Sequence, residues 1–261
     1  PWLSFQAAIG VYQQPPSFPV LLPGIDTFAL KLGLQRAQST VISEETKLPG
    51  ELSLRVSGYH QRFFNMTDMP PLGSSICAAP PPESLHGTTA TLVRLADGQA
   101  YGMEVWLRRS VGLISGWIAY TLSRSERSYP CGVRPADYDQ THVLQVVAQA
   151  RLPRGFVAGV RLQFTTGRPE TLVPMDTDAS SPLQQADDHR LRDALGNNIR
   201  LPNYVQLDVR IDKRWIFRKW YLHAFLEVVN ATFSRTNLYL AYPSSDDLAA
   251  GRKDPELLGF N

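Results

Sequence analysis

Apolar and polar residues alternate along most of the chain, and the longest alternation lies between residues 204 and 229. From Val205 to Ile211 every second residue is aliphatic, and the residues between them are polar or charged. After a short turn the alternation restarts at Trp220. A period of two predicts two β-strands in a hairpin, each with one apolar and one polar face. Each strand has about ten residues, the length that a tilted strand needs to cross a bilayer.

The same pattern recurs throughout the sequence. It predicts about ten strands, at residues 3–12, 27–43, 52–58, 101–108, 114–123, 143–151, 156–165, 205–214, 220–229 and 237–242. Long segments follow the odd-numbered strands and short turns follow the even-numbered ones. In an antiparallel up-and-down meander this places every long loop on one side, as in an outer-membrane barrel. A soluble sheet would keep the alternation, but its strands usually have about five or six residues.

The charged face of these strands is predicted to line the lumen of the barrel. Shifting the strand at Val205 by one residue would turn Arg210 and Arg214 towards lipid, at about 2 to 4 kcal/mol for each near the midplane. The lumen row then consists of Glu104, Arg161, Asp208, Arg210 and Asp212. Two roles stay open for this row: ion pairs within the wall, or contact with whatever fills the pore.

Composition narrows the functional classes. The net charge of +2 indicates no nucleic-acid footprint, and the longest apolar run is too short for a transmembrane helix. Cys77 and Cys131, the two cysteines, permit at most one disulfide, which would join two long loops on the same side. The chain starts without Met or a signal peptide, so we expect a mature or excised piece of a protein.

Candidate chemistry on the strands is sparse. His223 and Glu227 lie four apart on one strand face, and a hydrogen bond in the lumen is favoured over acid–base chemistry because no nucleophile motif joins them. By parity Trp106 and Trp117 also face the lumen, where packing is favoured over ligand stacking. A solvated loop is favoured over a cation site at residues 187–189. The sequence predicts no enzyme, cofactor or resident metal.

Several motifs resemble the barrel of TonB-dependent outer-membrane receptors. One is the hairpin formed by AYGMEV (100–105) and GLISGWIAYTLS (112–123). The others are GVYQQPP (10–16), FTTGRP (164–169), LPNY (201–204) with LDVR (207–210) and Lys213, and LEVVN (226–230). Their order and spacing span nearly the whole chain.

The resemblance implies a barrel of about 22 strands around a plug domain. Residues 1–261 are then expected to be one partial transmembrane β-barrel domain from the C-terminal portion, without the plug, the TonB-contacting segment or the first strands. The family's closing strand, which usually ends in an aromatic residue, is not evident after Phe260.

In function, the resemblance implies energy-coupled uptake of a scarce nutrient, such as an iron–siderophore complex or cobalamin, through a Gram-negative outer membrane. The implied partners are the bilayer, the plug, TonB and a small-molecule ligand such as a metal chelate, and the long loops at 67–98, 126–140 and 168–202 would capture that ligand. The lumen-facing candidates for plug or ligand contact are Glu104, Trp106, Arg161, Asp208, Arg210, Asp212, His223 and Glu227. The alternatives are a plug-less porin-like channel and a soluble β-sandwich binding module.

Overall fold

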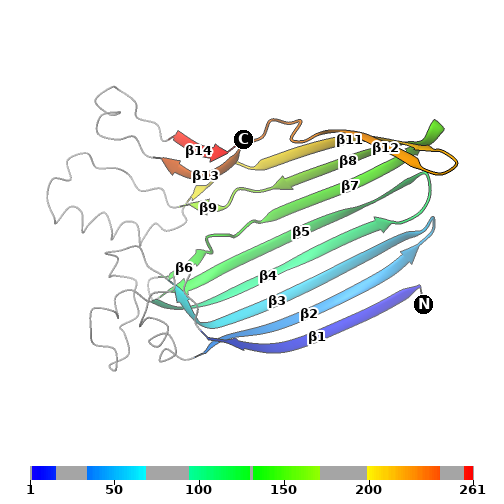
Figure 1. Ribbon diagram of the computed structural model, residues 1–261. Coiled ribbons are helices and arrows are strands. Elements are labelled where there is room, and N and C mark those ends of the chain that lie inside the picture. The colour runs from blue at the N-terminus through cyan, green and yellow to red at the C-terminus, as the bar shows by residue number, and fades with distance from the viewer. Residues whose placement is uncertain are drawn as a thin grey trace, which may run out of the picture.

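The computed structural model describes residues 2–15, 34–68, 94–129, 132–170, 199–241 and 256–260. Their main feature is one large antiparallel sheet (Figure 1). Its strands are β1 (Leu3–Gln14), β2 (Gln35–Leu48), β3 (Leu52–Asp68), β4 (Arg94–Arg109), β5 (Ile114–Tyr129), β6 (Gly132–Pro135), β7 (His142–Leu152), β8 (Phe156–Thr165), β11 (Tyr204–Ile216) and β12 (Tyr221–Val228). The expected up-and-down meander is confirmed.

Neighbouring strands of the sheet follow one another along the chain. Their order is β1-β2-β3-β4-β5-β7-β8-β11-β12, and the short β6 pairs with the end of β5. Two small hairpins lie outside this sheet: β9 (Pro169–Glu170) with β10 (Ile199–Arg200), and β13 (Thr236–Ala241) with β14 (Glu256–Phe260). The predicted tenth strand is therefore β13, but it pairs with β14 instead of extending the large sheet.

The short turns all lie at one end of the sheet, on the right in Figure 1. At two of them a glycine adopts the left-handed conformation that a tight reversal requires: Gly50 has φ 78° and Gly155 has φ 76°. In the latter turn Pro153–Gly155 forms a single 3-10 turn between β7 and β8. Glycine and proline at these positions are the reason why the alternation in the sequence stops there.

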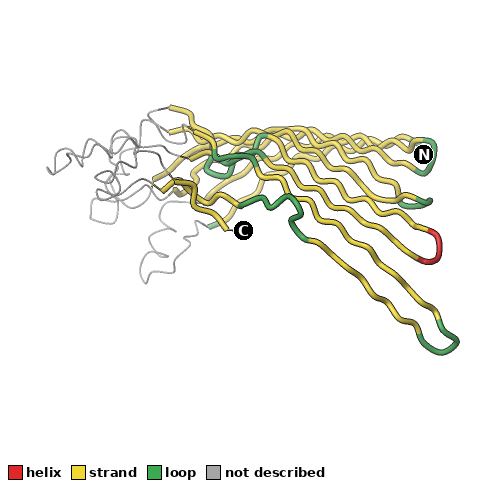
Figure 2. Tube along the Cα trace, turned by 90° about the horizontal axis from the view of Figure 1, so that it is seen from above, coloured by secondary structure: helices red, strands yellow, loops and turns green. Residues whose placement is uncertain are grey.

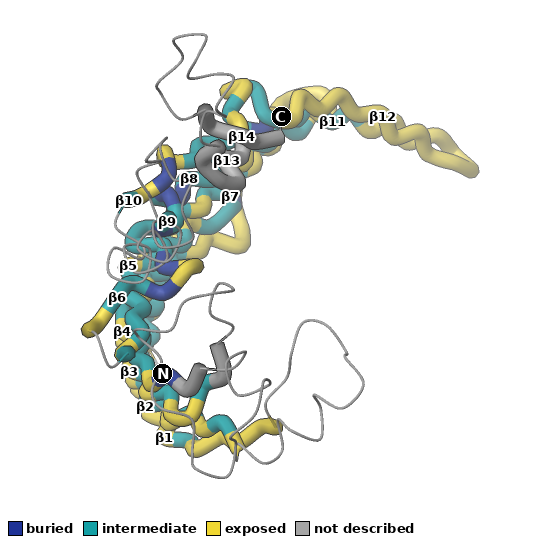
Figure 3. The backbone as a smooth tube through the Cα atoms, turned by 90° about the vertical axis from the view of Figure 1, so that its left-hand side faces the viewer, coloured by how far each residue is buried: buried dark blue, intermediate teal, exposed yellow. Residues whose placement is uncertain are grey.

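The sheet is curved and open. Viewed along the strands it forms a trough, and the β11–β12 hairpin diverges from it (Figure 3). The same hairpin bends away from the other strands when the sheet is seen from above (Figure 2). Only Tyr204–Lys213 of β11 pairs with β8, and within the described residues β1 and β12 are unpaired edges. Both edges offer backbone groups to further strands, which a closed barrel would supply.

The described residues have almost no apolar core. Only Ala96, Ala136 and Leu201 are buried hydrophobic residues. The aliphatic side chains of the strands are instead half-buried or exposed, and Val209 and Ile211 on β11 are 45% and 43% exposed. A water-soluble sandwich would bury such a face against a second sheet, so this arrangement favours a face that contacts lipid.

Among the described residues, no helix is long and apolar enough to cross a membrane.

Several strands are longer than predicted, mostly towards the long loops. β3 continues past the aromatic cluster at Phe63 and Phe64 to Asp68, and β4 begins at Arg94. The expected loop at 126–140 is wrong in its first part, because β5 reaches Tyr129 and pairs there with β6. Backbone pairing continues in these regions although the side chains no longer alternate. The start of the predicted second strand, at 27–33, lies outside the described residues.

Gly102 is needed because the Tyr59 ring lies over it. A Cβ at Gly102 would lie 2.4 Å from the carbonyl oxygen of Leu122 and 2.8 Å from the Tyr59 hydroxyl oxygen. We expect Gly102→Val to lower the free energy of unfolding by about 2 kcal/mol through overpacking. The matched control is Gly58→Val, because a Cβ at Gly58 meets nothing within 4 Å. Chemical unfolding of the full-length protein measures both, and equal effects would contradict the prediction.

Candidate functional site

The polar residues of successive strands lie on one face of the sheet. In the pairing register Trp106 lies opposite Ala119, and the same row continues through Gln145 and Gln163 to Gln206. Residues that pair directly share a face. The register therefore places on this face all the candidates named from the sequence: Glu104, Trp106, Arg161, Asp208, Arg210, Asp212, His223 and Glu227. We call this face the polar wall.

On β2 and β11 the polar wall is the more enclosed of the two faces. Asp208 is 3% exposed, whereas its aliphatic neighbours Val209 and Ile211 on the other face are each more than 40% exposed. Along β2 the odd-numbered residues from 35 to 45, on the polar wall, are half-buried, whereas the even-numbered ones are mostly exposed. Side chains converge on the inside of a curved sheet and spread on the outside. The burial pattern therefore indicates that the polar wall lines the inside of the trough.

Asp208 is the centre of one hydrogen-bond network on the polar wall. Its carboxylate accepts hydrogen bonds from Arg161 Nε at 2.6 Å, from Gln206 Nε2 at 2.8 Å and from the Asn230 backbone N–H at 2.8 Å. Gln206 in turn accepts a hydrogen bond from the Tyr204 hydroxyl. Asp208 lies directly opposite Arg161 in the β8–β11 register, so the pair forms without bending either strand. The buried charge is thus fully compensated within the wall.

A second network begins at Arg210. Its guanidinium binds Asp212 through two hydrogen bonds of 2.9 and 2.8 Å, and it also contacts Glu227 at 3.3 Å. The same guanidinium lies 3.9 Å from the centre of the Phe225 ring. His223 hydrogen-bonds to Asp212 at 2.8 Å. His223 and Glu227 therefore each bind a partner on β11, and a direct bond between them is not part of the network.

Glu104 and Trp106 lie apart from these networks, with β5 and β7 between them and β8. They line a groove of about 500 Å³. Its other polar-wall residues are Ser43, Arg55, Ser57, Trp117, Ala119, Thr121 and Gln145. Arg55 binds Glu45 at 3.2 Å and lies 5.7 Å from the Trp106 ring centre. Glu104 is exposed and makes no hydrogen bond or ion pair within the described part of the chain. The groove therefore combines two indole rings with an uncompensated carboxylate.

Sequence reasoning missed a buried ionic cluster at the long-loop end of the sheet. Asp139 is 1% exposed and accepts a 2.6 Å hydrogen bond from the Ser125 backbone N–H. Arg200 donates to the Asp139 carboxylate, to its carbonyl oxygen at 2.9 Å and to the Gly167 carbonyl at 3.2 Å. Arg124 approaches the same carboxylate at 3.8 Å. The cluster ties β5 and the turn before β7 to β10. The sequence offers no signal for it, because the partners are far apart and no pattern joins them.

Glu126 marks the same end of β5, beyond the length that a bilayer requires. It accepts hydrogen bonds from Gln99 Nε2 at 2.9 Å and from Arg124 Nε at 3.1 Å. These hydrogen bonds, that from Gln99 first, hold the pKa of the Glu126 carboxyl below its ordinary value. The carboxylate therefore stays charged in mildly acidic surroundings and keeps β4 and β5 paired there.

Comparison with known proteins identifies the fold. Searches with the sequence find no matching protein family and no matching curated protein. The structure is similar to the ferric-catecholate import receptor Fiu from E. coli K12, with a TM-score of 0.58 and 12% identity over 90% of this chain and 29% of that one. It is also similar to the outer-membrane ferripyoverdine receptor of Pseudomonas aeruginosa, with a TM-score of 0.59 and 13% identity over 90% of this chain and 28% of that one.

The chain has the barrel fold of TonB-dependent receptors. It spans less than a third of the length of the two receptors it matches. In this receptor fold the inside of the trough is the lumen side, which agrees with the enclosure of the polar wall. Contact of the eight candidates with a plug or a ligand stays a prediction.

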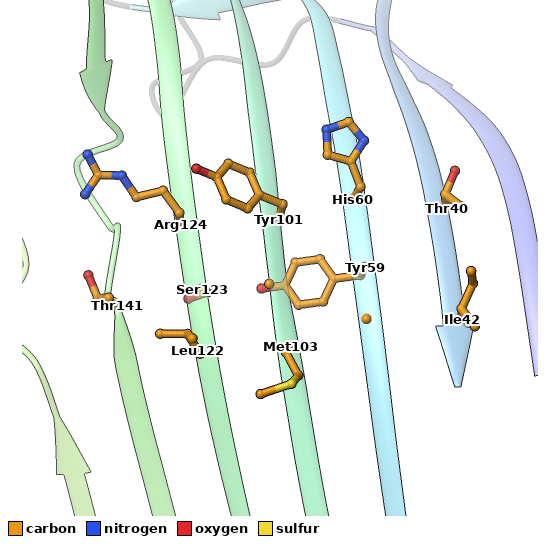
Figure 4. Close-up of a pocket in the computed structure, with 12 residues that line it drawn as sticks. Thr40, Ile42, Tyr59, His60, Tyr101, Met103, Leu122, Ser123, Arg124 and Thr141 are labelled. Atoms are coloured by element: carbon orange, nitrogen blue, oxygen red, sulfur yellow. The ribbon is translucent and has the colours of Figure 1, made fainter. Parts of the chain in front are cut away.

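The face of the sheet opposite the polar wall carries a hollow of about 660 Å³ across β2 to β5 (Figure 4). Its lining is mainly apolar, from Ile42, Met103 and Leu122, and Tyr101 and His60 lie beside it with ring centres 6.5 Å apart. Gly58 adds no side chain on this face, which contributes to the depression. Its apolar lining fits the face of the barrel that contacts lipid.

Two further expectations lie outside the described residues. Cys77 and Cys131 are both there, so the disulfide stays a prediction, and so does the interpretation of residues 187–189 as a solvated loop. Among the residues that the structure describes, no group of three or more His, Cys, Asp or Glu side chains is placed to hold a metal ion.

Proposed function

We propose that the chain is part of a TonB-dependent outer-membrane receptor that takes up a scarce nutrient, such as an iron–siderophore complex or cobalamin. The observation that carries the proposal is the receptor barrel fold over 90% of the chain, shared with a ferric-catecholate import receptor and an outer-membrane ferripyoverdine receptor. The proposed location is the outer membrane of a Gram-negative bacterium. Uptake would depend on TonB and on a plug domain, both contributed outside these residues.

The polar wall supports this role. Arg161 binds Asp208, and Asp212 binds Arg210. The wall therefore presents a fixed, hydrogen-bonded surface to the lumen. The groove at Glu104 and Trp106 lacks such compensation. We propose that the plug or a passing ligand contacts the wall there. A ligand or plug group with a positive charge would match the free carboxylate.

The test is uptake of radiolabelled ferric siderophore by cells that express the full-length gene in a receptor-deficient strain. We expect saturable uptake that disappears when TonB is removed. A panel of ferric catecholates, ferric hydroxamates and cobalamin would identify the nutrient class. Uptake of none of them, in a strain with the protein in its outer membrane, would contradict the proposal.

The alternative from the sequence, a plug-less porin-like channel, makes a different prediction. A channel without a plug conducts ions steadily in a planar bilayer, whereas a plugged receptor does not. Steady conductance together with TonB-independent uptake would favour the channel. The soluble sandwich is not proposed, because the apolar face has no covering sheet within the described residues.

A further inference from the structure

The short-turn end of the sheet is strongly basic. Its four turns, at 47–52, 108–113, 151–156 and 213–221, contain a single acidic residue, Glu51. They contain nine basic residues: Lys47, Arg108, Arg109, Arg151, Arg154, Lys213, Arg214, Arg218 and Lys219. The whole chain has a net charge of only +2, so the rest of the chain is net acidic. Every one of the four turns contributes to this concentration of positive charge.

These nine residues lack the ion pairs that several arginines elsewhere in the described sheet form. Within the described residues none of the nine forms an ion pair with an acidic side chain, although eight of them are exposed. On the polar wall and at the long-loop end, in contrast, several arginines are paired, as Arg161 is with Asp208 and Arg200 with Asp139. Exposed cations that the protein leaves unpaired repel one another unless an external anion compensates them.

The basic residues divide between the two faces of the sheet. Lys47, Arg108, Arg151 and Arg214 belong to the polar wall by register. Arg109 and Lys213 belong to the apolar face, and Arg154, Arg218 and Lys219 lie in the turns themselves. The Lys213 ammonium shows how the second group is placed. It donates to the Arg154 carbonyl and lies 4.3 Å from the Phe156 ring centre, so its stem runs along the apolar face towards the turn.

Exposed aromatic side chains lie at the same level. In the turn between β11 and β12, Phe217 and Trp220 stack with ring centres 3.9 Å apart, and Arg218 and Lys219 lie between them in sequence. Trp215, on the apolar face, is 40% exposed. Aromatic rings beside cations at the end of an apolar face are typical of the interface between hydrocarbon and headgroups. A soluble acidic protein would offer no matching partner for the adjoining apolar face.

We propose that the turns and apolar-face cations at this end bind the headgroups of anionic phospholipids in the membrane leaflet next to the short turns. Arg109, Arg154, Lys213, Arg218 and Lys219 would contact the phosphates, and Trp215 and the Phe217–Trp220 pair would sit among the glycerol backbones. The proposal rests on the membrane-spanning barrel and does not depend on which nutrient is transported. It specifies both the class of lipid that is bound and the end of the barrel that binds it.

The test uses the full-length protein in vesicles of phosphatidylglycerol and phosphatidylcholine at about one to four, followed by extraction in polymer nanodiscs and lipid analysis. At about 1 kcal/mol for each cation near a headgroup, we expect phosphatidylglycerol in the nanodiscs to exceed its bulk fraction by about two-fold or more. The quadruple variant Arg109→Gln, Arg154→Gln, Arg218→Gln and Lys219→Gln should return the ratio to the bulk value.

The matched control removes four positive charges from the polar wall at the short-turn end. Its substitutions are Lys47→Gln, Arg108→Gln, Arg151→Gln and Arg214→Gln. This variant should keep the enrichment. Equal loss in both variants would overturn the proposal, because overall charge and not headgroup contact would then be responsible. Enrichment that persists unchanged in the first quadruple variant would also overturn it. Binding of siderophore in the same preparation reports separately on the proposed transport function.

Discussion

Replacing Arg161 with methionine is expected to lower the free energy of unfolding by about 3 kcal/mol, because Asp208 would remain buried without its cation. Asp208 is 3% exposed, and Arg161 supplies its only positively charged partner among the described residues. The remaining hydrogen bonds, from Gln206 and the Asn230 N–H, involve neutral donors. The measurement is denaturant unfolding of the full-length protein refolded in detergent micelles.

The matched control for this variant is Arg55→Met. Arg55 pairs with Glu45 across two adjacent strands of the same wall, but the two side chains are 42% and 35% exposed. Exposed pairs contribute at most about 1 kcal/mol, so this variant should change stability little. The double variant Arg161→Met with Asp208→Asn should recover part of the loss, since no charge remains buried. Equal effects of Arg161→Met and Arg55→Met would show that the neutral donors suffice for Asp208.

The sequence was sufficient to predict the strands and the two faces. The alternation from Val205 to Ile211 reports directly on which side chains lie outward, because the period of a strand is fixed at two. Even some wall contacts follow from spacing alone, since Arg210 and Asp212 are two apart on one face and bind each other. In these regions local pattern and tertiary structure agree.

The partners across strands were less predictable. The sequence placed Arg161 and Asp208 on the same face, but their pairing depends on the register between β8 and β11, across the undescribed stretch at 171–198. His223 was expected to find its partner in the lumen, and Asp212 on the neighbouring strand is that partner. A slip of two residues would keep every side chain on its face and change every pair. The alternation therefore determines faces but leaves register open.

The strand ends and the Asp139 cluster were beyond the reach of the pattern. Where β5 extends from Ser125 to Tyr129 both faces carry polar residues, so alternation disappears while backbone pairing continues. Outside the bilayer neither face requires apolar side chains, so the residue pattern no longer shows on which face a side chain lies. Contacts there depend on how the loops fold back, as Arg200 does onto Asp139.

Replacing Asp139 with alanine is the second change for which we expect a large effect, a loss of about 3 kcal/mol in the free energy of unfolding. The Ser125 N–H would lose its acceptor, and Arg200 and Arg124 would lose the carboxylate that they share. Hydrogen exchange should localise the damage, since the Ser125 amide should exchange faster while amides near the short turns keep their protection.

The control is Glu104→Ala, which removes the same charge from an exposed position without a hydrogen bond or ion pair in the described part of the chain, and should change stability by no more than about 0.5 kcal/mol. A double-mutant cycle with Arg200→Met then separates the ion pair from the backbone contact. If Asp139 acts mainly through Arg200, the two losses will not add. If they do add, the Ser125 N–H is the main partner of Asp139, and the carboxylate stabilises the end of β5 instead of joining it to β10.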